Sequence, residues 1–337
     1  MNSGRNKRRA GGSSAGSDDG FFEPFVPDAF CREFVELRGH SNSIFNYMAV
    51  VLELKPLLDD WIPRAVLDSF VETGRKKYGL HVMHDVALAR EWGDDRTGAP
   101  LKGGAGPAKR KTQRGRQPVA VRRDYAHVFV SRSPDNLEKG YRSGWYPGFQ
   151  GSEIERPFAD NLRFGGALGY PACCLDFFAA SHAERNFLFS ILSATGGEPD
   201  FRCNCLAKDT PYSYIHHMPC SFNCRESILY ADNLRAEILK REPDYVRRTD
   251  RHLRLPYLVF EDQFIYAFDG RMEGTDAVSY SRSRFVGHPR CDAYSELFAG
   301  GDRLEVSGKK FRVFRGGEPA GGAAAPAKNR MFLVRFA

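Results

Sequence analysis

Long hydrophobic runs are missing from this sequence. Its most apolar stretch, residues 47–54, is far too short to cross a bilayer and contains Glu53. The first 20 residues include a basic patch with no apolar segment after it, which does not fit a secretory signal. No segment is repeated along the chain. These absences predict a cytoplasmic protein that neither spans a membrane nor belongs to a repeat class.

A nucleotide-binding glycine motif is also missing. Residues 165–169, Gly-Gly-Ala-Leu-Gly, follow no predicted strand. A dinucleotide fingerprint needs a strand directly before it and a helix directly after it. We therefore reject a dinucleotide site in this segment.

Basic charge is concentrated in two segments. The chain has a formal net charge of +7, and much of the excess lies in residues 5–9 and 102–123. A flexible basic segment attracts nucleic acid or another polyanion without sequence preference, so 102–123 predicts weak polyanion binding. The alternative, which we favour, is a solvated insertion without a partner.

Hydrophobic patterning predicts an α+β protein. Apolar residues recur at helical spacing in the first quarter, a mixed region follows, and alternating runs at the end favour antiparallel hairpins. The expected parts are a disordered tail (1–20), a helical region (21–94), a basic low-complexity loop (95–123), a central cysteine-motif domain (124–255), and a β-rich C-terminal region (256–337) with a flexible loop at 316–328.

Several elements are predicted individually. We expect helices at 134–142, 223–241 and 244–252, a strand at 125–131, hairpins turning at 261–263 and 307–308, and a last strand within 330–337. Residues 143–160 are expected to form an irregular packed connection. His81 and His84 have the i, i+3 spacing of a metal site on a helix, but we favour a histidine pair without metal.

Cysteines are the main chemical signal. Six of the eight fall between residues 173 and 224, and Cys31 and Cys291 stand apart. A disulfide framework requires an oxidising compartment, which a cytoplasmic protein lacks. Clustered cysteines then indicate metal ligands or reactive thiols, whereas the two isolated ones are expected to be small buried side chains.

The first cysteine motif is GYPACCLDFF, residues 169–178. Pro171 favours a helix start, which places Cys173 and Cys174 in the first helical turn. The free N–H groups and the helix dipole there lower the pKa of a thiol and favour metal ligation or nucleophilic attack. Because adjacent helical residues point in different directions, we expect only one of the two to face the site.

The second motif is HMPCSFNCRES, residues 217–227. Asn223 and Glu226 have the spacing of a capping box, which makes Cys224 the first helical residue. Cys220 lies on the incoming turn, and Cys-x3-Cys can chelate zinc or hold one edge of an iron–sulfur cluster. His217 is close enough in sequence to be a further ligand or a catalytic proton donor.

A third pair, Cys203 and Cys205, lies on a predicted loop and is either a further metal chelate or incidental. With this pair and His217, more ligands are available than one zinc ion needs. That surplus favours an iron–sulfur cluster over zinc as the cofactor.

Together, the two motifs resemble those of an uncharacterised prokaryotic family, a domain of unknown function found in archaea and bacteria. Its pattern is Gly-Tyr-Pro-x-Cys-Cys followed by aromatics, then His-x-Pro-Cys-Ser-x-x-Cys. The resemblance covers residues 125–250 and implies that Cys173, Cys174, His217, Cys220 and Cys224 form the site. The family implies no reaction, and Cys203 and Cys205 have no counterpart in its pattern.

Three functions follow from these features. The first is an enzyme that uses a cysteine-bound cluster or metal for redox, sulfur-transfer or small-molecule modification chemistry on a small-molecule or protein substrate. The second is a zinc-stabilised binding module whose basic loop engages nucleic acid. The third is a metal-free dithiol redox protein.

Overall fold

The computed structural model describes residues 25–84, 124–144, 158–181, 187–260, 264–287, 292–324 and 331–337. The predicted tail at 1–20, the basic loop at 95–123, most of the connection at 143–160 and Cys291 lie outside these residues. Among the helices described, none combines the length and apolar character that a membrane span requires.

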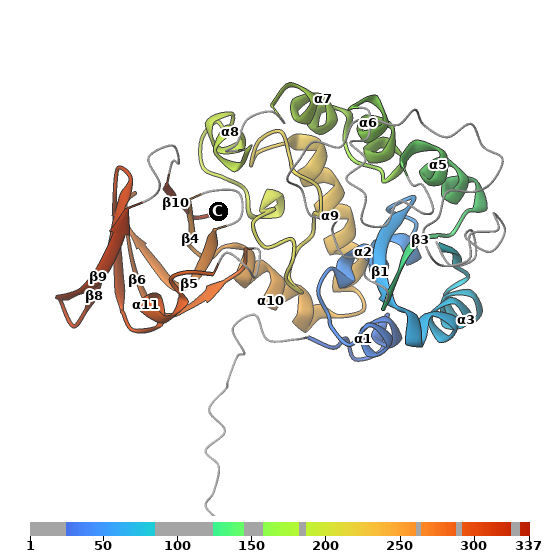
Figure 1. Ribbon diagram of the computed structural model, residues 1–337, viewed down its shortest axis with the longest axis horizontal. Coiled ribbons are helices and arrows are strands. Elements are labelled where there is room, and N and C mark those ends of the chain that lie inside the picture. The colour runs from blue at the N-terminus through green and yellow to red at the C-terminus, as the bar shows by residue number, and fades with distance from the viewer. Residues whose placement is uncertain are drawn as a thin grey trace, which may run out of the picture.

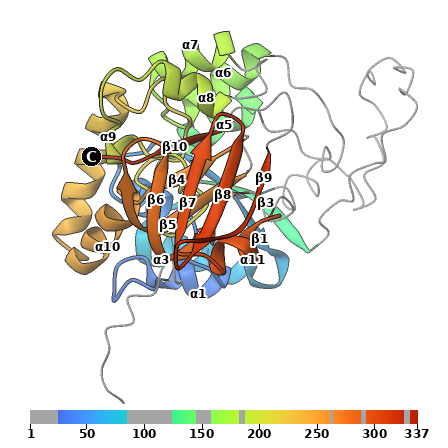
Figure 2. The same cartoon turned by 90° about the vertical axis from the view of Figure 1, so that its left-hand side faces the viewer.

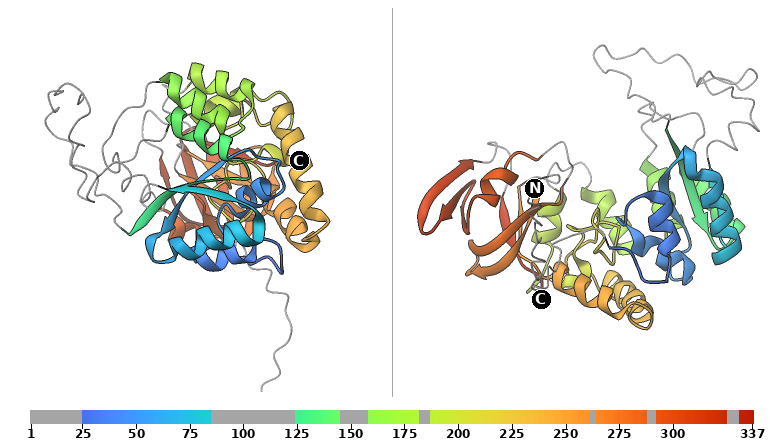
Figure 3. Two further views of the ribbon diagram at one scale, coloured as in Figure 1. Left: turned by 90° about the vertical axis from the view of Figure 1, so that its right-hand side faces the viewer. Right: turned by 90° about the horizontal axis from the view of Figure 1, so that it is seen from below.

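The molecule is an α+β protein, as the sequence predicts, with two antiparallel sheets at opposite ends and helices between them (Figures 1 and 3). The smaller sheet has the strand order β1-β3-β2 and the larger has the order β10-β4-β5-β6-β7-β8-β9. The small sheet consists of β1 (Leu58–Pro63), β2 (His81–His84) and β3 (Tyr125–Ser131).

The N-terminal region is not wholly helical, so that prediction is wrong in part. Its helices are α1 (Arg32–Arg38), α2 (Ile44–Val51), the 3-10 turn η1 (Arg64–Val66) and α3 (Leu67–Tyr78). β1 and β2 interrupt them, and both pair with β3 rather than with each other. Because that partner lies far along the chain, local propensity does not reveal the two strands. His81 and His84 therefore lie on a strand and not on a helix.

The helices between the sheets include all three that the sequence predicts in the middle of the chain. They are α5 (Pro134–Gly144), α6 (Phe158–Ala167), α7 (Ala172–Ser181), α8 (Phe187–Ser193), η2 (Phe201–Cys203), α9 (Arg225–Leu239) and α10 (Pro243–Leu253). α6 and α7 follow one another along one side of the molecule, with α9 beside them (Figure 1).

One hydrophobic core joins the two halves of the chain. Its buried side chains come from α1, α2, α3, β1 and β3 and also from α8, α9, α10 and β4, for example Phe45, Ile62, Val128, Leu234 and Tyr257. Phe45 packs on Tyr245 with ring centroids 4.8 Å apart. The cysteine-bearing helices therefore rest on a shared core.

The larger sheet faces the viewer in Figure 2. Its strands are β4 (Tyr257–Val259), β5 (Ile265–Glu273), β6 (Ala277–Phe285), β7 (Arg303–Ser307), β8 (Lys310–Arg315), β9 (Glu318–Ala324) and β10 (Phe332–Val334). The helix α11 (Ser295–Ala299) packs against this sheet and shares with it a second hydrophobic cluster. Both predicted hairpins are present, β4 with β5 and β7 with β8. Gly308 has φ +61° in the turn of the second hairpin, a conformation that favours glycine.

The predicted flexible loop at 316–328 is wrong over its first half, because β9 pairs with β8 as an edge strand. An edge strand tolerates Pro319, since one side of it needs no partner. Gly322 is required for the close approach: a Cβ there would lie 2.4 Å from the carbonyl oxygen of Phe311.

The C-terminus returns to the cysteine region. β10 pairs with β4, and Phe336 meets Phe222 edge to face with ring centroids 5.0 Å apart. The backbone N–H of Ala337 donates to the carbonyl of Pro199, and that of Phe201 donates to the carbonyl of Ala337. These contacts hold the loop before α9 in place.

Candidate metal centre

The turn between α6 and α7 places the first cysteine pair. Gly169 has φ +79°, and a Cβ there would lie 2.6 Å from Cδ of Pro56, so glycine is needed for both reasons. The carbonyl of Pro171 accepts from the N–H groups of Cys174 and Leu175, which closes the first turn of α7. Both motif cysteines thus lie in the first helical turn, as predicted.

The loop before α9 places the second pair. Phe222 is fully buried, and its N–H donates to Thr195 Oγ1 at 2.9 Å. The predicted capping box is wrong, because Cys224 itself is the N-cap residue of α9. Asn223 instead accepts from the N–H of Asp200 and donates to the carbonyl of Gly196, so it fixes the loop rather than the helix end.

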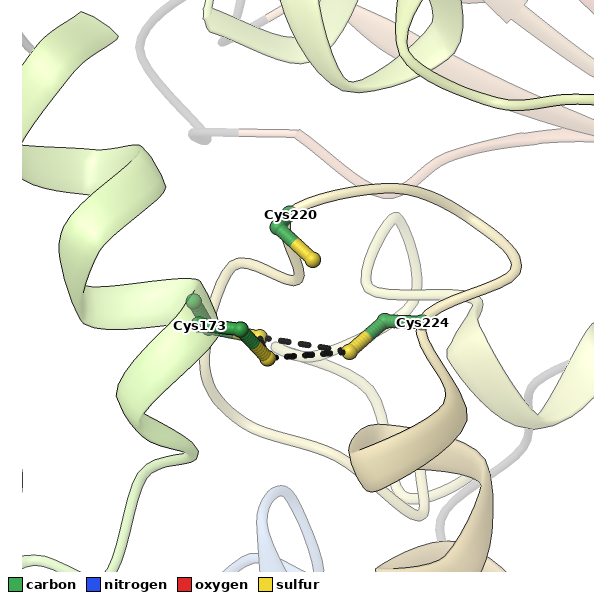
Figure 4. Close-up of side chains that lie close together, drawn as sticks. Cys173, Cys220 and Cys224 are labelled. Atoms are coloured by element: carbon green, nitrogen blue, oxygen red, sulfur yellow. Dashed lines mark hydrogen bonds between the residues drawn. The ribbon is translucent and has the colours of Figure 1, made fainter.

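Four sulfur atoms meet where α7 and α9 begin. The Sγ atoms of Cys173, Cys174, Cys220 and Cys224 all lie within 4.8 Å of one another. Cys224 Sγ is 3.7 Å from Cys173 Sγ and 3.6 Å from Cys174 Sγ, and the last two are 3.9 Å apart. Figure 4 shows the labelled side chains pointing toward a common centre. This group could hold a metal ion.

The expectation that only one of the adjacent cysteines faces the site is therefore wrong. Both sulfurs belong to the group although Cys173 is exposed and Cys174 is 2 % exposed. The two side chains leave the helix in different directions, but the site lies at the helix end, where both can reach it.

Of the four thiols, Cys224 is the first to lose its proton as the pH rises. A hydrogen bond from Cys174, with further ones from Ser227 and Cys220, lowers the pKa of the Cys224 thiol to about 4. That thiolate, as hydrogen-bond partner, raises the pKa of Cys174, and burial raises the pKa of Cys173 and, to about 12, that of Cys220. The predicted lowering of the pKa at this helix start is not observed, because burial raises the pKa of Cys173, and the neighbouring Cys224 thiolate together with burial raises that of Cys174.

A metal cation would change this balance. It lets several thiols ionise together, because each thiolate then faces a positive charge at bonding distance. The positive ends of the α7 and α9 dipoles also face the sulfurs, which favours the excess negative charge of a thiolate site. The seven described cysteines are free thiols, so all four members of the group are available as ligands.

Behind the sulfurs lies a buried polar pair. His217 Nε2 is 2.8 Å from Ser227 Oγ, which in turn is 3.5 Å from Cys174 Sγ. Burial lowers the pKa of His217 to about 3, so its imidazole is neutral at physiological pH. Ser227 lies between His217 and the sulfur group. The predicted role of His217 as a ligand or catalytic residue stays a prediction.

Cys203 and Cys205 are not members of the four-sulfur group. Cys203 is fully buried beside it, and its Sγ donates to the carbonyl oxygen of Cys224 at 3.5 Å. Cys205 belongs to the main hydrophobic core. Cys31 is also fully buried in that core, as the sequence predicts.

A surface cavity of about 460 Å³ opens beside the site. Cys173 is the one cysteine that lines it, together with residues of the α6–α7 turn and one face of α9: Gly169, Pro171, Ala172, Glu226, Leu229, Tyr230 and Asn233. Arg225 and Asp176, two charged residues within the cysteine motifs, are exposed and outside this lining.

The sequence analysis missed Ser227 and most of the cavity. Ser227 lies three residues after Cys224, which puts it on the same face of the first turn of α9. Glu226, Leu229, Tyr230 and Asn233 have the spacing of one helical face, a signal visible in the sequence. What the sequence could not supply was the neighbouring turn that closes the other side.

We compared the chain with protein-family models, curated proteins and solved structures, and none of them matches it. The resemblance of its two motifs to a prokaryotic family therefore stays a prediction.

Proposed function

We propose that this chain is a zinc-binding protein whose four-cysteine group holds one tetrahedral zinc ion. The carrying observation is the sulfur spacing. With bonds of about 2.3 Å from zinc to sulfur, neighbouring sulfurs of a tetrahedral site lie about 3.8 Å apart. Three of the separations in this group are 3.6, 3.7 and 3.9 Å.

The spacing of the ligands supports a single metal over a cluster. The surplus of cysteines that favoured iron and sulfur falls away because neither Cys203, which packs beside Cys174 and Cys224, nor Cys205, in the main core, is a member of the four-sulfur group. In a cubane cluster each cysteine binds a different iron, so the sulfurs are spread more widely than the ligands of one ion. Four cysteines around one ion is the usual set of a structural zinc site.

The proposed ion would fasten α7 to α9. Cys174 and Cys220 are 46 positions apart in the sequence, and the two pairs meet through their sulfurs and a small cluster that includes Ile228. Ligation at this point would hold the N-terminus of α7 against the N-terminus of α9. One proposed ligand, Cys173, is exposed and lines the cavity, so the site is accessible from that side.

Metal analysis of the protein, purified anaerobically without added metal, tests this proposal. We expect about one zinc per chain and no visible absorption band, as for other structural sites. A brown protein with iron and acid-labile sulfide would contradict zinc and favour the cluster enzyme. A metal-free protein whose thiols cycle reversibly would favour the dithiol redox alternative.

Paired variants identify the ligands. Cys220→Ala removes one of the four sulfurs and should lose the metal, whereas Cys203→Ala removes a buried neighbour and should keep it. Both changes delete one thiol from the same region, so a general effect on folding would act on both. If Cys203→Ala loses the metal and Cys220→Ala retains it, the proposed ligand set is wrong.

A further inference from the structure

We propose that Cys173 is a site of oxidation by hydroperoxides, and that its disulfide with Cys224 releases the metal. This inference rests on the proposed zinc centre. It assigns to one ligand a reactivity that the other three do not share, and it makes metal occupancy depend on the supply of peroxide.

Access separates the four sulfurs. Cys174 is 2 % exposed and Cys224 is 4 % exposed, so neither presents its sulfur to solvent. Cys220 is half-buried, and it does not line the cavity. Cys173 is exposed and lines the cavity, so a molecule that enters there meets this sulfur first.

The cavity admits more than hydrogen peroxide. Its volume of about 460 Å³ lies in the range of small-molecule sites. Pro171 and Leu229 offer apolar surface, and the side chains of Glu226 and Asn233 offer polar groups. Leu229 is 54 % exposed, so a bound apolar group would cover apolar surface there. Small organic hydroperoxides, which carry both an apolar body and a polar end, fit this lining.

The second sulfur of the disulfide is Cys224. Its Sγ lies 3.7 Å from Cys173 Sγ, so a small movement forms the bond. Cys174 is equally near at 3.9 Å but is next in the chain. Adjacent Cα atoms are about 3.8 Å apart, below the range of about 4.4–6.8 Å that disulfides usually span. A disulfide between adjacent cysteines is therefore disfavoured.

The reaction proceeds in two steps that use one equivalent of hydroperoxide. The Cys173 thiolate attacks the outer oxygen, the O–O bond breaks, and the alkoxide takes a proton from water and leaves as the alcohol. Cys173 is now a sulfenic acid. The Cys224 thiolate attacks its sulfur, the S–S bond forms, and hydroxide leaves and is protonated to water. Two electrons pass from the two sulfurs to the two oxygens.

Loss of two ligands releases the metal. A zinc ion that keeps only Cys174 and Cys220 has half of its thiolates, and the disulfide sulfurs no longer carry the charge that binds it. The contact between α7 and α9 then depends on the S–S bond instead of the metal. A small dithiol reductant reverses the change by thiol–disulfide exchange and regenerates all four ligands.

The test uses zinc-loaded full-length protein treated with hydrogen peroxide or tert-butyl hydroperoxide. Zinc release is followed with a chromogenic chelator, and the linked peptides are identified by mass spectrometry. We expect a peptide pair joined through Cys173 and Cys224, formed in step with zinc release and reversed by dithiothreitol. Cys173→Ser removes a ligand, so it is compared with the wild type as metal-free reduced protein. There it should slow disulfide formation by peroxide about tenfold or more, because the remaining sulfurs are shielded.

A pair of variants on α9 tests the role of the cavity without touching a ligand. Leu229→Trp fills the cavity and should slow the reaction of tert-butyl hydroperoxide more than that of hydrogen peroxide. Leu239→Trp is the matched control, since Leu239 is 40 % exposed at the other end of the same helix. We expect it to leave both rates unchanged.

The two proposals fail in different ways. A protein that holds no metal contradicts the zinc proposal, while peptide mapping of the reduced protein still tests the reactive pair. Metal-free reduced protein that forms a disulfide at the same rate with Cys173→Ser as without it overturns the inference. So does a disulfide that joins Cys174 to Cys220, or an equal effect of the two tryptophan variants on both peroxides.

Discussion

Ser227 Oγ lies 3.5 Å from Cys174 Sγ, on the buried side of the four-cysteine group. Its second neighbour, His217 Nε2, is 2.8 Å away. When the neutral imidazole of His217 donates its Nε2–H to Ser227 Oγ, the serine hydroxyl can donate its own hydrogen to Cys174 Sγ. Hydrogen bonds of this kind orient a metal ligand and spread its charge.

Ser227→Ala should therefore weaken zinc binding about tenfold or more, the effect that loss of an outer hydrogen bond commonly has. The side chain it removes is fully buried, and alanine fits the same space. Competition against a chromogenic chelator measures the change in affinity. Ser143→Ala is the control, because Ser143 bonds only within its own helix α5. Equal affinities in the two variants would show that the serine does not support the site.

A second prediction concerns the junction of α9 with α10. Asp250 accepts from Nε and Nη2 of Arg235 and from the hydroxyl of Tyr214, and its side chain is 14 % exposed. Asp250→Asn removes the charge that pairs with Arg235. We expect a loss of about 2 kcal/mol in the free energy of unfolding, below the cost of a fully buried pair because Arg235 is partly exposed.

Asp244→Asn is the matched control on the same helix. Asp244 also pairs with an arginine, Arg247, but the two side chains are 78 % and 68 % exposed. Exposed pairs contribute less than about 1 kcal/mol, so this variant should unfold at nearly the wild-type urea concentration. Similar midpoints for both variants would contradict a stabilising role for Asp250.

Local features of the site could be predicted from the sequence. Pro171 directly precedes α7, and the spacing after Cys224 indicates α9, because both signals lie within one helical turn. The cap of α9 was misassigned, since Asn223 has the right chemistry for a cap but bonds to the distant backbone of Asp200 and Gly196. Competition from a tertiary partner is not visible in a local pattern.

Features that depend on distant partners could not be predicted. β1 pairs with β3, and the paired residues Trp61 and His127 are more than sixty positions apart in the sequence. β9 pairs with β8, where Gly322 lies opposite Arg312, although the sequence of β9 is typical of a loop. The meeting of the two cysteine motifs was inferred from ligand chemistry, but the separation of Cys203 from the group was not.

The last prediction concerns acid. His252, on α10, is 4 % exposed, its Nδ1 lies 2.9 Å from the carbonyl oxygen of Arg248, and its ring packs on Tyr212 with centroids 4.3 Å apart. Burial lowers its pKa from 6.5 to about 4. As the pH falls below 6.5, the unfolded chain takes up a proton that the folded protein does not. The contribution of His252 to the free energy of unfolding therefore falls until about pH 4 and then levels off.

His252→Gln keeps a hydrogen-bond donor near Arg248 but cannot take up a proton. Between pH 6.5 and pH 5 the variant should lose about 2 kcal/mol less stability than the wild type, at about 1.4 kcal/mol per pH unit. Urea unfolding at several pH values measures both slopes. His216 and His217, whose pKa values burial also lowers to about 3, act equally in both proteins and cancel. If His252→Gln keeps the wild-type slope, the histidine is not buried in its neutral form, and the packing of α10 against Tyr212 differs from that described.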